Sequence, residues 1–154
     1  VCSCFKRTRL QTKMKNRVIE ILLIEDDPDD AELTIYALKK YNLVNHLHHI
    51  DDGEKALEFL YGSEDNTPKL ILLDLRMPRV DGVTILRKLK SDPEKKDIPV
   101  VALLSSNEGK NYVESFHLKA DAYIVKPVDF KKFFIAISEI GLTWKITDSS
   151  VIDQ

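Results

Sequence analysis

The stretch Leu70-Ile71-Leu72-Leu73-Asp74-Leu75-Arg76-Met77-Pro78 decides the fold of this chain. It begins with four apolar residues and no polar alternation, which is the pattern of a strand buried on both faces in a helix-covered parallel sheet. A charge inside such a strand is unfavourable, so we expect Asp74 at its C-terminal end, where the chain leaves the sheet. Ligand sites of open α/β sheets lie beyond the carboxyl ends of the strands, which predicts a functional role for Asp74.

Composition narrows the classes of protein to which the chain can belong. The 154 residues suit one domain with a core, and the net charge of −2 argues against a dedicated nucleic-acid or membrane-surface binder. No apolar run approaches the length of a transmembrane helix. Both cysteines, Cys2 and Cys4, lie at the start of the chain, so a disulfide framework is excluded for its body and a reducing, cytoplasmic location is expected.

The two ends of the chain differ from its centre. Residues 1–13 are basic, lack apolar periodicity and precede Met14, so we interpret them as an expression-derived or upstream-translated extension. A metal or redox site at the C-x-C of this segment is disfavoured, because no second ligand pair accompanies it. We expect a single domain over residues 14–144 and a C-terminal tail over residues 145–154.

Strand and helix patterns alternate along the chain. Apolar runs predict strands at residues 19–24, 47–50, 70–74, 99–104 and 122–125. Helical patterns, the first of them capped by Asp27, are expected at residues 28–40, 54–60, 83–89 and 111–118, and after Asp129. In the last helix, the apolar residues that we expect to face inward are Phe130, Phe133, Phe134, Ile137 and Ile140. Five such βα units predict an α/β fold with a doubly wound, five-stranded parallel sheet and right-handed crossovers.

Four charged residues follow three of these strands: Glu25, Asp26, Asp74 and Lys126. All carboxyl ends of a parallel sheet lie at one edge, so these side chains can converge there. Each close carboxylate pair costs about 4 kcal/mol at an effective dielectric constant of about 20, so the cluster needs a cation. All-oxygen ligation suits Mg²⁺, and Lys126 could meet a phosphoryl oxygen. The alternative is a buried ion-pair network, which is disfavoured because four charges at strand ends seldom coincide.

These motifs resemble a known family. Glu25-Asp26, the stretch D-L-R-M-P-R-V-D-G from Asp74 to Gly82, and Lys126-Pro127 together resemble the receiver domain of two-component response regulators, over about Val18 to Ile140. The fragment E-D-D-P-D-D-A-E-L and the ending Y-I-V-K-P-V-D are similar to the small stand-alone receivers associated with phytochrome-type histidine kinases. The resemblance implies the flavodoxin-like (βα)5 receiver fold and Mg²⁺-dependent phosphoryl transfer from a sensor histidine kinase to Asp74.

The resemblance also implies a role for each site residue. The metal ligands would be Asp74, Asp26 directly, Glu25 through water and the backbone carbonyl of Arg76. Lys126 would pair with a phosphoryl oxygen and would be joined to Pro127 by a cis peptide bond. Tyr123 would be the aromatic residue that moves inward on activation.

One position departs from the family pattern. The family usually has Thr or Ser at the end of the fourth strand, where this chain has Leu104. The nearest hydroxyl groups belong to Ser105 and Ser106. The usual contact between this hydroxyl and the phosphoryl group, and with it the coupling to activation, is therefore in question.

The expected function is that of a stand-alone phospho-acceptor signalling domain, not an enzyme beyond weak self-dephosphorylation. Only a short segment follows the last predicted helix, so we expect output through contacts with an unidentified downstream protein. That helix carries more apolar residues than one buried stripe needs, which predicts a homodimer or a partner interface on its face. Two alternatives remain open. An Asp-nucleophile, Mg²⁺-dependent phosphohydrolase is disfavoured, because that class has D-x-D after its first strand where this chain has E-D-D. A degenerate receiver that only binds partners is kept open by Leu104.

Overall fold

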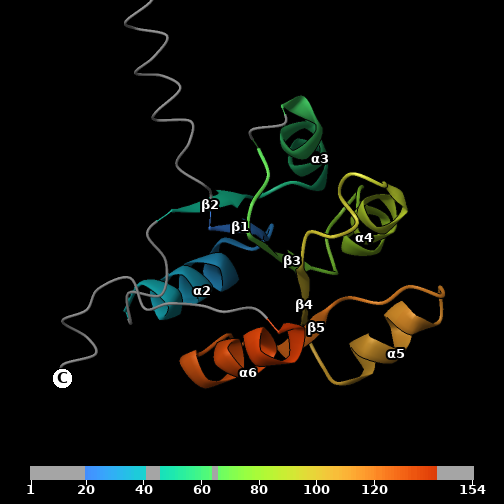
Figure 1. Ribbon diagram of the computed structural model, residues 1–154. Helices are drawn as coiled ribbons and strands as arrows, with labels where there is room; N and C mark the ends of the chain where they lie inside the picture. The colour runs from blue at the N-terminus through green and yellow to red at the C-terminus, as the bar shows by residue number, and fades with distance from the viewer. Residues whose placement is uncertain (1–19, 41–45, 64–65, 142–154) are drawn as a thin grey trace, which may run out of the picture.

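The computed structural model describes residues 20–40, 46–63 and 66–141, and within them five parallel strands form one sheet. The strands are β1 (Ile21–Ile24), β2 (Leu47–Ile50), β3 (Leu70–Asp74), β4 (Val100–Leu104) and β5 (Ala122–Val125). Their order across the sheet is β2-β1-β3-β4-β5, so β3 is central and all carboxyl ends share one edge (Figure 1). The predicted parallel sheet is confirmed.

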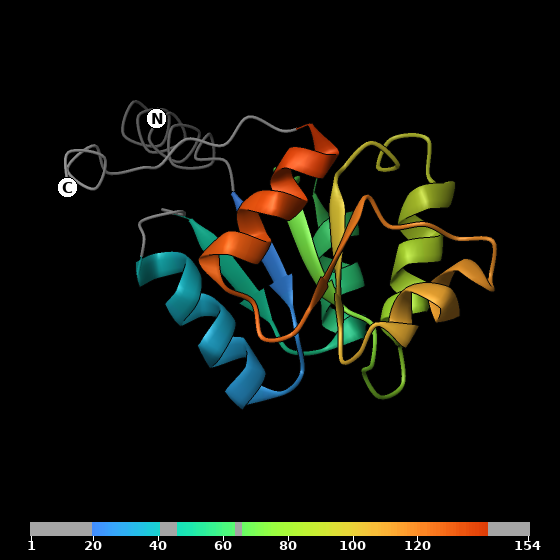
Figure 2. The same ribbon diagram turned by 90° about the horizontal axis from the view of Figure 1, so that it is seen from below.

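Helices cover both faces of this sheet. They are α2 (Pro28–Lys40), α3 (Gly53–Gly62), α4 (Gly82–Ser91), α5 (Glu108–Glu114) and α6 (Phe130–Ile140). Helices α2 and α6 lie side by side on one face, and α3, α4 and α5 lie on the other (Figures 1 and 2). This arrangement is the predicted doubly wound α/β fold. Within the described ranges, none of these helices combines the length and the apolar character that crossing a membrane requires.

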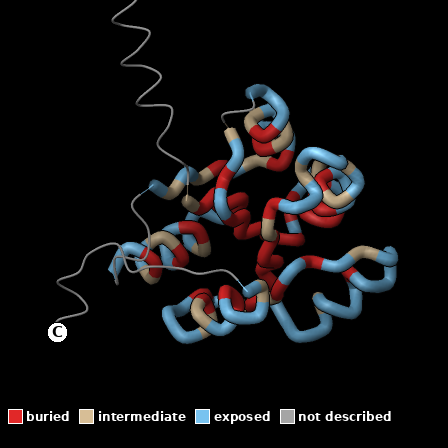
Figure 3. Tube along the Cα trace, in the orientation of Figure 1, coloured by how far each residue is buried: buried red, intermediate tan, exposed pale blue. Residues whose placement is uncertain are grey.

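The apolar run of β3 is explained by two hydrophobic cores, one on each side of the sheet. Ile71 and Leu73 pack into the core beneath α3, α4 and α5, whereas Leu70 and Leu72 pack into the core beneath α2 and α6. Every residue of β1, β3 and β4 is buried (Figure 3). Burying each large apolar side chain contributes about 1.5–3 kcal/mol, so the central strands hold the domain together.

Aspartates begin most of the helices at the carboxyl edge of the sheet. The Oδ1 atom of Asp27 accepts hydrogen bonds from the backbone N–H groups of Asp29 and Asp30 at 2.9 and 3.3 Å, which confirms it as the cap of α2. Three further aspartates cap α3, α4 and α6, namely Asp52, Asp81 and Asp129. Each capped helix starts within eight residues of the end of the preceding strand, which places the carboxyl edge of the sheet among helix N-termini.

The prediction for α5 was wrong at both ends. The helix spans Glu108–Glu114 instead of residues 111–118. Asn107 precedes it without a side-chain cap, and His117 adopts a left-handed φ of 60°, which takes the chain out of helical geometry. Asn is a common N-cap residue, but Asn107 makes no cap bond here, and no glycine marks the end of the helix.

Other predicted boundaries and faces also differ from the structure. The first strand begins at Ile21, α3 runs two residues beyond its predicted end, and β4 begins at Val100. Phe130 was expected to face inward but is 36% exposed. Of the other residues in the predicted set, Phe133 and Ile137 are buried, whereas Phe134 and Ile140 are half-buried. Residues 1–13 and 145–154 lie outside the described residues, so the proposed domain limits stay predictions.

Candidate functional site

The end of β1 supplies two carboxylates. The backbone N–H of Glu25 donates to the carbonyl of Ile50 in β2 at 3.1 Å, so sheet pairing still holds the chain at this residue. The Glu25 side chain is fully buried, and its Oε2 accepts a hydrogen bond from the Asp27 N–H at 3.3 Å. Asp26 is half-buried. Both carboxylates are therefore placed by the short turn between β1 and α2.

The end of β3 supplies the third carboxylate. Asp74 is 3% exposed, and its Oδ1 accepts a hydrogen bond from the Arg76 N–H at 3.2 Å. The loop after it returns tightly, because the Gly82 N–H donates to the Leu75 carbonyl at 3.1 Å. A Cβ atom at Gly82 would lie 2.3 Å from the Asp74 carbonyl oxygen, so only glycine allows α4 to begin against the strand end.

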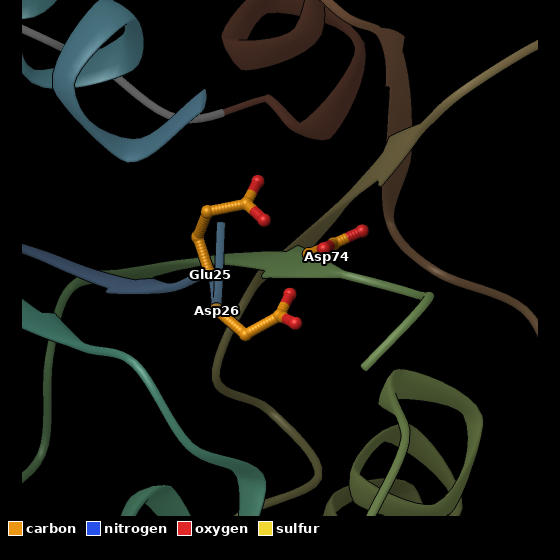
Figure 4. Close-up of side chains that lie close together, drawn as sticks. All are labelled: Glu25, Asp26 and Asp74. Atoms are coloured by element: carbon orange, nitrogen blue, oxygen red, sulfur yellow. The ribbon is translucent and has the colours of Figure 1, made fainter. Parts of the chain in front are cut away.

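The carboxylates of Glu25, Asp26 and Asp74 point into one space (Figure 4), and one oxygen of each lies within 4.8 Å of the others. Burial, followed by a hydrogen bond to Asp74 and its negative charge, raises the pKa of Glu25 to about 8. Burial and the charge of Asp74 also raise the pKa of Asp26. This convergence of mutually repelling oxygens fits a hard divalent cation such as Mg²⁺, whose ligands are oxygens.

Lys126 reaches the same cluster from the end of β5. Its Nζ lies 2.8 Å from Asp30 Oδ2, 3.1 Å from Glu25 Oε1 and 3.6 Å from Asp74 Oδ1. Burial lowers the pKa of Lys126, but the hydrogen bond to Asp30 and the charges of Asp74 and Glu25 outweigh burial and raise it, so the ammonium group stays charged. The peptide bond that joins Lys126 to Pro127 is cis, as the family resemblance implies.

Leu104 is packed into the hydrophobic core. It is 3% exposed at the end of β4, and a Cβ atom at Gly109 would lie 2.7 Å from its Cδ2. The side chain therefore fills the space beside the start of α5. Ser105 and Ser106, the nearest hydroxyl groups, are exposed.

Tyr123 is half-buried and held at the N-terminal side of its strand. Its hydroxyl oxygen accepts a hydrogen bond from the Ala120 N–H at 3.0 Å, and the Lys110 ammonium lies 5.4 Å from its ring centroid. Burial raises the pKa of Tyr123. In this structure the ring therefore has defined partners away from the carboxylate cluster.

Sequence reasoning missed two residues that contact the cluster. Asp30, an acidic residue in the first turn of α2, makes the shortest ion pair with Lys126. His49, on the edge strand β2, has its Nε2 atom 2.8 Å from the carbonyl oxygen of Glu25. Acidic residues are common in the first turn of any helix, so Asp30 did not stand out. The alternation of side chains along β2 shows that His48 and His49 face opposite ways, but not which residues each of them contacts. Neither contact had a signal in the sequence.

Comparisons with known proteins agree with this geometry. The sequence profile described as "Response regulator receiver domain" matches residues 21–138. The response regulator Rcp1 of Synechocystis sp. (strain ATCC 27184 / PCC 6803 / Kazusa) is 35% identical over 128 residues, which cover 80% of this chain and 87% of Rcp1.

Solved structures give the same result. The bacteriophytochrome response regulator AtBRR is 39% identical, with a TM-score of 0.78 over 86% of this chain and 99% of that one. Its counterpart RtBRR is 40% identical, with a TM-score of 0.77 over 85% and 82%. The Mn(2+)-bound form of Rcp1 is 33% identical, with a TM-score of 0.60 over 79% and 88%. The predicted flavodoxin-like (βα)5 fold is thereby confirmed.

Proposed function

Because this chain belongs to the response regulator receiver family of two-component systems, a family of signalling domains, we propose that Asp74 accepts a phosphoryl group from a sensor histidine kinase in an Mg²⁺-dependent reaction. The observation that carries this proposal is the position of Asp74. It ends the central strand, belongs to the carboxylate cluster, and lies 3.6 Å from the Lys126 ammonium. No other aspartate of the described residues belongs to both the carboxylate cluster and the central strand.

The proposed step needs little covalent chemistry from the protein. An oxygen of the Asp74 carboxylate attacks the phosphorus of a phosphohistidine, and a P–O bond forms as the P–N bond breaks. The electron pair of the broken bond leaves with the imidazole, which takes up a proton from solvent. Positioning and neutralisation of charge are then the main tasks of the site.

The proposed metal ligands are the carboxylates of Asp26 and Asp74, Glu25 through a water molecule, and the backbone carbonyl of Arg76. The carboxylate cluster supports the three carboxylates of this set, and the relative Rcp1, whose solved structure is described as an Mn(2+)-bound form, supports a divalent cation. A bound Mg²⁺ would offset the negative charge on the phosphoryl oxygens. Lys126 would donate to one of these oxygens, because its ammonium already lies next to Asp74.

The proposed partners are proteins. Two relatives are named as bacteriophytochrome response regulators, which supports a phytochrome-type, cytoplasmic histidine kinase as the phosphoryl donor. Output would pass through the face formed by α5, β5 and α6. There α6 exposes Ile135 and Phe130 beside a shallow groove of about 520 Å³ that Phe134 also lines. We propose that this face docks a second copy of the chain or a downstream protein.

The decisive experiment mixes the protein with acetyl phosphate and Mg²⁺ and measures the intact mass. We expect one added phosphoryl group in the natural protein, none in Asp74→Asn, and none when EDTA replaces Mg²⁺. Full labelling of Asp74→Asn would contradict the assignment of the acceptor. A natural protein that never gains the phosphoryl group would instead be a receiver-fold binding module.

A further inference from the structure

We propose that Asp30 is a positioning residue that holds the Lys126 ammonium in place for the phosphoryl group on Asp74. The inference rests on the proposed function, but it concerns a contact that the described residues already make. Asp30 lies in the first turn of α2 and Lys126 follows β5, so the two elements meet only in the folded domain.

The distances identify Asp30 as the principal partner of Lys126. Their ion pair is 2.8 Å long, against 3.1 Å to Glu25 and 3.6 Å to Asp74. The Lys126 side chain is only 15% exposed, so this ammonium group is held inside the site and does not extend into solvent. Asp30 and Glu25 therefore hold the lysine between α2 and the end of β1.

This arrangement leaves one proton of Lys126 for the reaction. An ammonium group has three N–H donors, and two of them bond to Asp30 and Glu25. The 3.6 Å separation from Asp74 is too long for a hydrogen bond. A phosphoryl group on Asp74 extends beyond the carboxylate oxygen, so it would bring its own oxygen towards the remaining donor.

Without Asp30 the lysine would lose this orientation. Its four-carbon stem is flexible, and a single remaining bond to Glu25 would let the ammonium adopt other rotamers. Some of them would pair fully with Asp74 and so oppose its attack on phosphorus. Asp30 therefore acts through Lys126, not through the metal ligands.

Asp29 is the matched control. It is the neighbouring acidic residue in the same first turn of α2, so it has the same favourable interaction with the helix N-terminus. It is exposed, and the carboxylates that pair with Lys126 within the described ranges are those of Glu25, Asp30 and Asp74. A purely helical role would make Asp29→Ala and Asp30→Ala equivalent.

The experiment compares the rate of Asp74 phosphorylation by acetyl phosphate at saturating Mg²⁺. We expect a decrease of about tenfold in Asp30→Ala, the usual size of the coupling between contacting charged residues, and little change in Asp29→Ala. Mg²⁺ affinity should stay within about twofold in both. In a Lys126→Ala background, Asp30→Ala should have no further effect, because its target is gone.

Two results would overturn the proposal. One is an unchanged rate in Asp30→Ala; the other is an equal decrease with and without Lys126. A second measurement is independent of phosphorylation: the ¹⁵N resonance of the Lys126 ammonium should broaden or vanish in Asp30→Ala but persist in Asp29→Ala. If the natural protein is never labelled, the proposed function fails, and this resonance alone decides whether Asp30 orients Lys126.

Discussion

His49 donates a hydrogen bond from Nε2 to the backbone carbonyl oxygen of Glu25, across 2.8 Å. A carbonyl oxygen only accepts, so Nε2 carries the proton. The neighbouring His48 stacks on Phe59 of α3, with ring centroids 4.6 Å apart, so the two histidines occupy opposite faces of β2. The bond from His49 thus ties the edge strand to the turn that presents Glu25 and Asp26.

Replacing His49 should weaken metal binding although it is not a ligand. His49→Phe removes the donor to the Glu25 carbonyl, which should lower the free energy of unfolding by about 1 kcal/mol and the Mg²⁺ affinity by roughly tenfold. Chemical denaturation and metal titration measure the two effects. His48→Gln, on the opposite face, is the control and should keep its Mg²⁺ affinity. An unaltered affinity in His49→Phe would show that the strand alone positions Glu25.

Asp26 and Asp27 should separate metal binding from stability. Asp26 belongs to the carboxylate cluster, whereas Asp27 caps α2 through hydrogen bonds from Asp29 and Asp30. Asp26→Ala should lose most Mg²⁺ affinity. Asp27→Ala should lose about 1 kcal/mol of stability and keep its affinity. Metal titration and thermal unfolding of both variants check this, and equal losses of affinity would contradict it.

Without metal, stability should fall as the pH rises. The raised pKa of Glu25, about 8 against a usual 4.5, means that the folded protein keeps a proton that the unfolded chain has already released. The free energy of unfolding therefore decreases with pH from about 4.5 to about 8. Urea unfolding in EDTA should show this decrease in the natural protein and a smaller one in Glu25→Gln. Mg²⁺ should reduce it, since a bound cation favours the ionised form; identical pH slopes in both proteins would refute the assignment.

Leu104 should weaken the switch without abolishing phosphorylation. Leu104→Thr introduces a hydroxyl group that can bond a phosphoryl oxygen, an interaction of about 1.5–3 kcal/mol and enough to shift a two-state population roughly tenfold. It also removes a side chain packed beside Gly109, so stability should fall by about 2 kcal/mol or more. We expect similar labelling and a larger change in the NMR resonances of the Tyr123 ring. If phosphorylation of the natural protein already shifts the Tyr123 resonances completely, and Ser105→Ala does not reduce this shift, then activation does not need a hydroxyl group at position 104.

The exposed face of α6 should mediate association. Ile135 is 49% exposed, and its replacement by Lys should lower the average mass measured by light scattering at high protein concentration, because apolar area is removed from the interface. Leu33→Lys, at a similarly exposed apolar position on α2 (56% exposed), is the control and should leave the mass unchanged. If the natural protein stays monomeric at every concentration, self-association is excluded, and this face would instead bind a different protein.

The sequence by itself determined the doubly wound sheet and the convergence of Glu25, Asp26, Asp74 and Lys126. Unbroken apolar runs specify strands buried on both faces, and parallel strands bring their carboxyl ends to one edge whatever the loops do. Helix starts marked by aspartate caps were also predictable, whereas the uncapped α5 was misplaced.

Only the tertiary structure decided which neighbours complete the site. Asp29 and Asp30 are identical residues in the same helical turn, so the sequence does not distinguish them. The packing of α2 brings Asp30 to Lys126 and leaves Asp29 exposed to solvent. His48 and His49 differ only in the face of β2 that they occupy. Which residues each of them contacts is decided only when the helices pack against the sheet. These contacts join residues that are 96 and 24 positions apart, so no local pattern encodes them.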